Sequence, residues 1–166
     1  ASRRRSLART NSSALVELDW HLFEHEPKFS DIQQGSLGDC YWLASLAAVV
    51  YKKPGLIAKF FKFRGDARDA QGNPMKVWSI PLIVGGIEIS VAVDDRVPLS
   101  TREKSIAFAR PHDGDDIWPL LLEKAWAKVF GTYGAIVGGT GAEAMPALTG
   151  APVKVYNWKR DHIAEE

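Results

Sequence analysis

Two segments carry apolar residues at helical spacing. From about Cys40 to Tyr51, apolar residues at i, i+3, i+4 and i+7 form one stripe: Leu43, Leu46, Ala47 and Val50. Lys52-Lys53-Pro54-Gly55 then ends this predicted helix, since lysines suit its last turn and proline and glycine follow. From Ile117 to Phe130 a second apolar face comprises Trp118, Leu121, Leu122, Ala125, Trp126 and Val129. We predict shorter helices near 55–61 and 142–148.

Alternation of apolar and polar residues predicts strands in the middle of the chain. Met75 to Ile83 and Ile87 to Val93 are rich in β-branched residues and flank Val84-Gly85-Gly86, which predicts a hairpin. We expect a third strand at 105–109, a polar loop at 64–74, and a short helix or irregular packing segment at 14–23. Residues 153–158 are predicted to be an exit strand or linker. The fold class is therefore α+β, with a central helix that starts at Cys40 and a small antiparallel sheet.

Composition limits the possible functions. The 166 residues suit one globular domain, and 46% hydrophobic with 25% charged residues is ordinary for a folded chain. A net charge of +1 gives no reason to expect a nucleic-acid partner. No apolar run approaches the ~20 residues that span a bilayer. The single cysteine excludes an internal disulfide and fits a reducing compartment, so we predict a cytoplasmic location.

The candidate chemistry lies in Gln-Gly-Ser-Leu-Gly-Asp-Cys-Tyr-Trp-Leu, residues 34–43. Cys40 stands where a glycine-containing loop meets the predicted helix, and a helix N-terminus favours the nucleophilic thiolate. We expect Asp39 to cap the helix with its carboxylate. Gln34 can aim a side-chain amide at the same place, where it would join the Cys40 N–H in an oxyanion hole. Trp42 is either core or a wall of a substrate cleft.

A lone cysteine in an apolar run is usually a small buried hydrophobe, but the surrounding blocks favour a functional one. The segment 34–43, Val91-Ala-Val-Asp-Asp-Arg-Val-Pro98, Ile117-Trp-Pro-Leu-Leu-Leu-Glu-Lys-Ala-Trp-Ala-Lys128, Tyr133-Gly-Ala-Ile-Val-Gly-Gly139 and Leu148-Thr-Gly150 occur in this order. Together they resemble the calpain family of cysteine proteases over roughly residues 28–153. A tyrosine follows the cysteine, where the family more often has tryptophan.

The resemblance implies the nucleophile-bearing half of a papain-like cysteine protease core. It assigns residues 28–153 to this half-domain, and we expect 1–27 to be a flexible lead-in and short packing segment and 154–166 to be an exit strand or linker with a charged tail. Cys40 would be the nucleophile and Gln34 an oxyanion-hole residue, acting on a protein or peptide substrate. A second half-domain, as partner, would supply the catalytic His and Asn.

The histidines of the chain do not complete such a site. His162 lies in a charged tail with no Asn after it, and His112 lies in a predicted surface loop. We therefore expect little or no peptidase activity from the chain alone. The alternative is a catalytically inactive calpain-like module used for binding or assembly.

A calcium site is the second implication of the resemblance. In the family, acidic residues at the positions of Asp31 and Asp116 bind Ca²⁺ together with backbone carbonyls, which Glu24 and Glu26 would supply. Carboxylate and carbonyl oxygens are the ligands that Ca²⁺ prefers. Asp116 is otherwise a helix cap and Asp31 a turn residue, and Phe29 replaces an arginine common in calcium-regulated members. A calcium-binding regulatory domain is a third interpretation.

Overall fold

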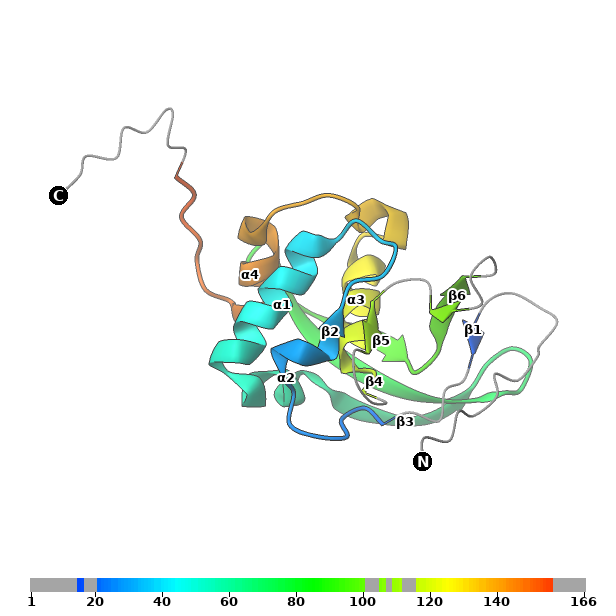
Figure 1. Cartoon of the computed structure of the whole chain (residues 1–166). Helices are drawn as coiled ribbons and strands as arrows, with labels where there is room; N and C mark the ends of the chain where they lie inside the picture. Colours follow the sequence, from blue (N-terminus) through cyan, green and yellow to red (C-terminus); the bar gives the residue numbers. More distant parts are fainter. Residues whose placement is uncertain (1–14, 17–20, 101–104, 107–108, 112–115, 157–166) are drawn as a thin grey trace.

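The fold places a group of helices against one part of a long curved sheet, as a computed structural model shows (Figure 1). The structure describes residues 15–16, 21–100, 105–106, 109–111 and 116–156. The predicted lead-in and charged tail therefore lie largely outside the described residues. Within the described part of the chain, no helix is long and apolar enough to cross a membrane.

The predicted helices are present with small shifts at their ends. They are α1 (Cys40–Lys52), α2 (Pro54–Phe60), α3 (Trp118–Val129) and α4 (Gly141–Thr149), with short 3-10 turns η1 (Phe29–Asp31) and η2 (Tyr133–Ile136). Helix α1 contacts α2, α3 and α4. Thr140 and Glu143 form a capping box at the start of α4, and Gly150 ends it in the left-handed conformation.

The main sheet is antiparallel in the order β3-β4-β5, comprising Lys62–Arg68, Pro74–Val84 and Ile87–Asp94. The predicted hairpin is β4–β5, and its turn is Gly85-Gly86 with φ of 59° and 81°. Both turn residues have positive φ, which glycine adopts without steric cost and which matches the twist of the strands. The expectation of a polar loop at 64–74 was wrong for its first half, because β3 pairs with β4 there.

Short strands complete the fold. β1 (Leu15–Val16), β6 (Val97–Ser100) and β7 (Ser105–Ile106) form a second sheet in the order β1-β6-β7, and β2 (Ile32–Gln33) pairs with β8 (Arg110–Pro111). Residues 15–16 are thus a strand, which corrects the expected helix or irregular segment. Of the predicted strand at 105–109, residues 105–106 form β7 and Ala109 is not in a strand, while residues 107–108 lie outside the described residues. Residues 151–156 are exposed and form no regular structure, so no exit strand is present at 153–156, and residues 157–158 lie outside the described residues.

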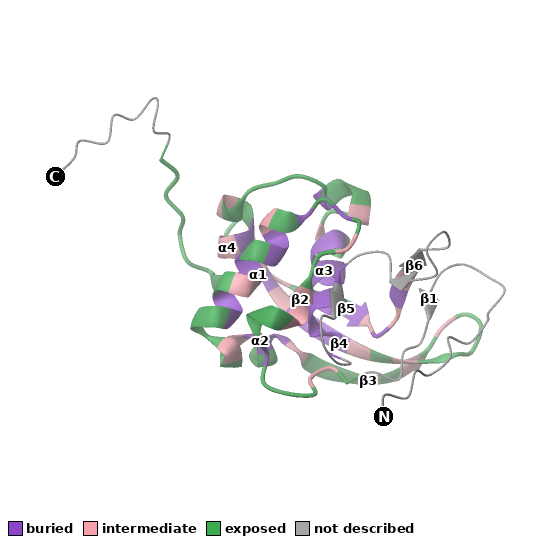
Figure 2. Cartoon of the chain, in the orientation of Figure 1, coloured by how far each residue is buried: buried purple, intermediate pink, exposed green. Residues whose placement is uncertain are grey.

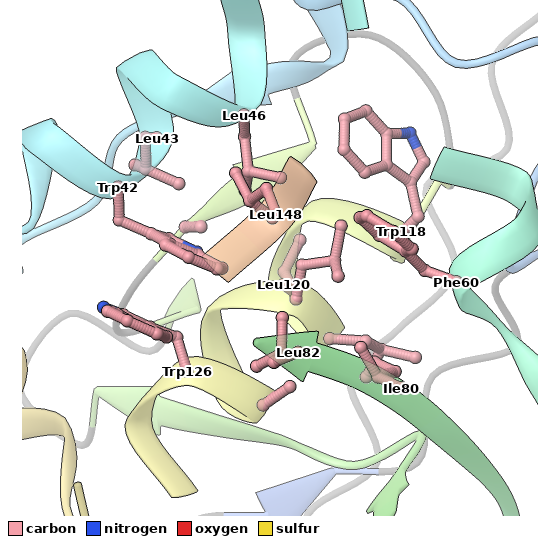
Figure 3. Packing of buried hydrophobic residues seen from close by; sticks show 14 of the residues in the cluster. Trp42, Leu43, Leu46, Phe60, Ile80, Leu82, Trp118, Leu120, Trp126 and Leu148 are labelled. Atoms are coloured by element: carbon pink, nitrogen blue, oxygen red, sulfur yellow. The ribbon is translucent and has the colours of Figure 1, made fainter. Parts of the chain in front are cut away.

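The core lies between the helices and the inner face of β4 (Figures 2 and 3). Helix α3 is its centre, because every residue from Trp118 to Ala127 is buried. Around it pack Trp42 and Leu46 of α1, and Ile80 and Leu82 of β4, all fully buried. Burial of aromatic and aliphatic side chains in this way is the dominant stabilising contribution to such a fold.

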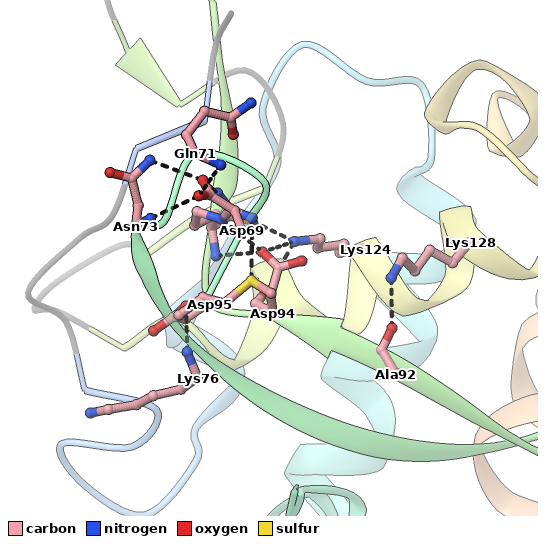
Figure 4. Close-up of polar contacts among 11 residues, drawn as sticks. Asp69, Gln71, Asn73, Lys76, Ala92, Asp94, Asp95, Lys124 and Lys128 are labelled. Atoms are coloured by element: carbon pink, nitrogen blue, oxygen red, sulfur yellow. Dashed lines mark hydrogen bonds and ion pairs between the residues drawn. The ribbon is translucent and has the colours of Figure 1, made fainter. Parts of the chain in front are cut away.

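One polar network ties α3 to the sheet (Figure 4). The Lys124 ammonium donates to the Asp94 carboxylate at 2.8 Å, to the Asp94 carbonyl at 3.0 Å and to the Arg96 carbonyl at 2.6 Å. Arg96 also pairs with Asp69. Burial acts to raise the pKa of Asp94, but the hydrogen bond and charge of Lys124 outweigh it, so the pKa of Asp94 is lowered. The network holds the C-terminal end of β5, at Asp94, against α3.

Candidate active site

Cys40 is the first residue of α1, and it is exposed. The backbone N–H groups of Trp42 and Leu43 donate to the Asp39 carbonyl at 2.8 and 3.3 Å, which fixes the first turn. The N–H of Cys40 itself has no acceptor within the helix, as at any helix start. The structure therefore presents an accessible thiol at the first residue of a helix.

Asp39 does not cap this helix, contrary to the prediction. Its side chain makes no capping hydrogen bond and is completely buried, 0% exposed. The carboxyl instead lies against that of Glu123 from the middle of α3. Glu123 was not singled out from the sequence. The available signal was an acidic residue that follows three leucines inside an otherwise apolar stretch.

Gln34 lies on the loop that leads to Cys40, with its side chain exposed. Its amide Nε2 donates to the Leu37 carbonyl at 2.7 Å. Leu37 is buried and anchors this loop in the core. A primary amide has two N–H donors, so this bond orients the Gln34 side chain and leaves a second donor for another acceptor.

The loop after η2 lies beside the loop that leads to Cys40, residues 34–39. The Gly138 N–H donates to the Gly38 carbonyl at 2.9 Å. At the next residue, a Cβ added to Gly139 would come within 2.5 Å of the Tyr41 ring. No side chain fits at Gly139 while Tyr41 keeps its position, so the glycine permits the close approach of backbone and ring.

Aromatic residues pack the start of α1 against α3. Trp42 is fully buried and stacks on Trp126, which settles Trp42 as a core residue (Figure 3). The Trp126 indole N–H donates to the Tyr41 hydroxyl at 2.9 Å. Residues on both sides of the first turn of α1 are therefore fixed to α3.

Asp31 and Asp116 lie close together. Asp31 is the last residue of η1, and Asp116 lies just before α3. Asp31 accepts from the Lys28 N–H at 2.7 Å and from the Trp118 indole N–H at 3.3 Å, and Asp116 accepts from the Glu24 N–H. Burial first, and then the negative charges of Asp31 and Glu24, raise the pKa of Asp116. Among the described residues, no three His, Cys, Asp or Glu side chains converge as a metal site would require.

The histidines that the structure describes lie near Asp116. The His21 carbonyl accepts from the Ile117 N–H at 3.1 Å, and the charge of His25 acts to lower the pKa of Asp116. Both side chains are exposed. His112 and His162 lie outside the described residues.

Comparison with known proteins decides the family. A sequence profile described as "Calpain family cysteine protease" matches residues 4–165. The chain belongs to the calpain family. Calpain-B of Drosophila melanogaster is 36% identical over 129 residues, which cover 78% of this chain and 13% of that protein. Calpain-8 of Rattus norvegicus and the calpain-2 catalytic subunit of Homo sapiens are each 32% identical over 131 residues, or 79% of this chain.

This calpain-family chain spans less than a fifth of the length of these relatives, 13–18%. Its α+β fold, with the central helix starting at Cys40, agrees with the half-domain predicted from the sequence. Chemically, the arrangement offers an exposed thiol, an amide on the preceding loop and a rigid aromatic support.

Proposed function

We propose that this chain is the cysteine-bearing half of a calpain-like endopeptidase, with Cys40 as its nucleophile. The observation that carries this proposal is the position of Cys40, an exposed thiol at the first residue of α1 in a member of a cysteine-protease family. The thiolate is the form of a cysteine that attacks a carbonyl carbon. Exposure leaves the sulfur accessible to a peptide substrate.

In the complete enzyme, the Cys40 thiolate attacks the scissile carbonyl of a protein or peptide. The carbonyl oxygen becomes an oxyanion, and the Cys40 N–H together with the Gln34 amide supplies its hydrogen-bond donors. Collapse of the intermediate expels the amine and leaves an acyl-enzyme, which water hydrolyses. A second half-domain supplies the His that moves the proton and the Asn that orients it.

Gln34 contributes as an oriented donor in this proposal. The bond from its amide to the Leu37 carbonyl holds the side chain over the loop before any substrate arrives. Such preorganisation matters because a donor already in place needs no reorganisation as charge develops. The nearby Gly38–Gly138 bond restrains the same loop from its other side.

The test uses the parent protein that contains the second half-domain and a quenched fluorescent peptide. Cys40→Ser should abolish cleavage. Gln34→Ala should lower kcat by roughly 10²–10³ while Cys40 alkylation by iodoacetamide continues at the wild-type rate. Gln33→Ala, the exposed neighbour, is the matched control and should leave kcat unchanged. Full activity of Cys40→Ser would refute the nucleophile, and a wild-type parent without any cleavage would favour the inactive binding module.

We also propose that Asp31 and Asp116 bind a calcium ion. The proximity of two carboxylates supports this idea. Burial first, and then the negative charge of Asp31, raise the pKa of Asp116, and a cation would favour its ionised form. The donor type fits Ca²⁺, but two carboxylates are too few, so backbone carbonyls such as those of Glu24 and Glu26 must complete the set. Bound calcium would hold the segment 24–31 against the start of α3.

Calorimetry of the chain with calcium chloride tests the site. We expect binding heat for wild type, loss of that heat in Asp31→Asn, and retention in Asp66→Asn, an exposed aspartate on β3. The calcium proposal fails if the wild-type chain gives no binding heat, and this outcome leaves the role of Cys40 untouched.

A further inference from the structure

The loop after η2 places one apolar side chain beside the segment that carries Cys40. A Cβ added to Gly38 would lie 3.3 Å from Cγ1 of Val137, so the valine side chain lies over the Gly38 backbone. Gly38 precedes Cys40 by two residues, which span at most about 7 Å. The Val137 side chain is 56% exposed. Core packing therefore does not explain why an aliphatic side chain stands at this position.

The same loop also contacts the chain on the other side of the cysteine. The backbone of Gly139 lies against the ring of Tyr41, the residue that follows Cys40. Because it makes contacts both before and after Cys40, the stretch 137–139 runs past the residue that carries the thiol (Figure 1). The other two residues of this stretch are glycines, so Val137 is the side chain that it presents there.

The backbone on both sides of Val137 is held in place. The residue before it, Ile136, is 1% exposed and anchors η2 in the core. The residue after it, Gly138, donates its N–H to the Gly38 carbonyl at 2.9 Å. A β-branched side chain on a fixed backbone has few rotamers to lose. Contact with a substrate would therefore cost little additional conformational entropy.

The chemistry of acyl transfer indicates which part of a substrate meets this loop. The His that accepts the proton of the nucleophile later donates it to the leaving amine, so the leaving amine must lie beside that His. In the proposed function the second half-domain supplies this His. The substrate residue whose carbonyl is attacked is thus left facing the half-domain that carries Cys40, with the carbonyl oxygen at the Cys40 N–H and the Gln34 amide.

We propose that Val137 is a specificity-determining residue, an apolar wall that favours an aliphatic side chain on the substrate residue whose carbonyl Cys40 attacks. Contact between the two side chains removes apolar surface of both from water, which favours leucine over a polar side chain of similar size. The stretch 137–139 contains no charged residue that would attract a charged substrate side chain instead. The inference rests on the proposed function, because it takes Cys40 as the nucleophile.

Two reagents test the wall without any need for peptidase activity: acetyl-leucine chloromethyl ketone and acetyl-glutamine chloromethyl ketone. Each places a ketone where the scissile carbonyl would lie. The Cys40 sulfur bonds to the adjacent methylene carbon, chloride leaves, and the thiol proton passes to solvent. Cys40 is the only cysteine of the chain, so cysteine adducts report on it alone. With each rate divided by that for N-acetylcysteine, the wild-type chain should react about fivefold faster with the leucine reagent.

Three variants show whether Val137 causes this preference. Val137→Ser removes the apolar wall without adding a charge and should bring the leucine-to-glutamine rate ratio close to one. Val137→Ile keeps an apolar wall and should keep the wild-type ratio. Ile87→Ser is the control, since Ile87 is an aliphatic residue on β5 that is 69% exposed, and it should also keep that ratio. Iodoacetamide carries no such side chain and should alkylate all four proteins at the same rate.

Equal rate ratios in wild type and Val137→Ser would overturn the proposal. A loss of iodoacetamide reactivity in Val137→Ser that matches its loss with the leucine reagent would also overturn it, because such a loss indicates a structural role. The proposed function fails separately. If the parent protein's Cys40→Ser variant still cleaves peptides, the nucleophile is wrong, whereas the rate ratios of the chain still decide whether Val137 selects the side chain beside the thiol.

Discussion

Trp42 and Trp126 stack face to face, with ring centroids 4.5 Å apart and planes inclined by 3°. The pair joins α1 directly to α3. Trp126 also meets Phe130 edge-on at 4.8 Å and donates to the Tyr41 hydroxyl. The turn that carries Cys40 is thus supported on α3 by one extended aromatic contact.

Loss of the Trp126 side chain should lower the free energy of unfolding. Trp126→Ala deletes a side chain that is 3% exposed, so we expect the free energy of unfolding to fall by about 3–5 kcal/mol. Trp126→Phe keeps an aromatic ring and should cost less, because chiefly the indole N–H bond to Tyr41 is lost. Urea denaturation followed by circular dichroism measures both. Phe63→Ala, at a side chain that is 58% exposed, is the control, and an equal cost there would contradict the prediction.

Gly139 should not tolerate alanine. The added Cβ would overlap the Tyr41 ring, so we expect Gly139→Ala to lower the free energy of unfolding by about 1–3 kcal/mol. In a Tyr41→Ala background the same change should cost much less, because the overlap is gone. Gly55→Ala, where a Cβ meets nothing within 4 Å in helix α2, should stabilise by about 0.5–1 kcal/mol. Additive costs of the Gly139 and Tyr41 changes would show that they do not interact.

The buried Glu123 should make stability depend on pH. Its pKa is about 9 in the folded chain against an ordinary 4.5, so the folded state holds a proton that the unfolded state releases. Stability from this group is complete below about pH 4.5 and is lost as pH rises toward 9, with a slope of at most ~1.4 kcal/mol per unit.

Glu123→Gln cannot titrate, so it should remove this slope. Between about pH 6 and pH 8 we expect wild type to lose roughly 2–3 kcal/mol relative to Glu123→Gln, measured by urea denaturation at each pH. Glu88→Gln, at an exposed glutamate on β5, should follow the wild-type curve. Parallel curves for wild type and Glu123→Gln would mean that Glu123 is ionised in the folded chain.

Local sequence patterns predicted the helices and the β4–β5 hairpin because each carries its own period or turn signal. Strand β3 carried neither. Its residues are charged or small, Phe63 is exposed, and its register with β4 shifts between Phe63 and Gly65. Pairing with β4, not burial of its own side chains, makes it a strand, and such pairing leaves no alternation in the sequence.

In the candidate site too, local sequence predicted some features, and contacts between distant residues decided others. The sequence predicted that α1 starts at Cys40, but the prediction for the Asp39 side chain was wrong because Glu123, far along the chain, faces it in the fold. The roles of Cys40 and Gln34, and calcium at Asp31 and Asp116, remain predictions, as do the domain limits and the cytoplasmic location. The second half-domain as partner also remains a prediction.

The hydrogen bond from Gly138 to Gly38 has a consequence for folding order. It joins a loop near the start of the domain to one that is synthesised much later, so the contact closes a long stretch of chain. Contacts of such high sequence separation form slowly, because chain entropy opposes them until most of the structure is in place. During synthesis the loop of residues 34–39 can therefore gain this contact only after α3 and η2 have emerged.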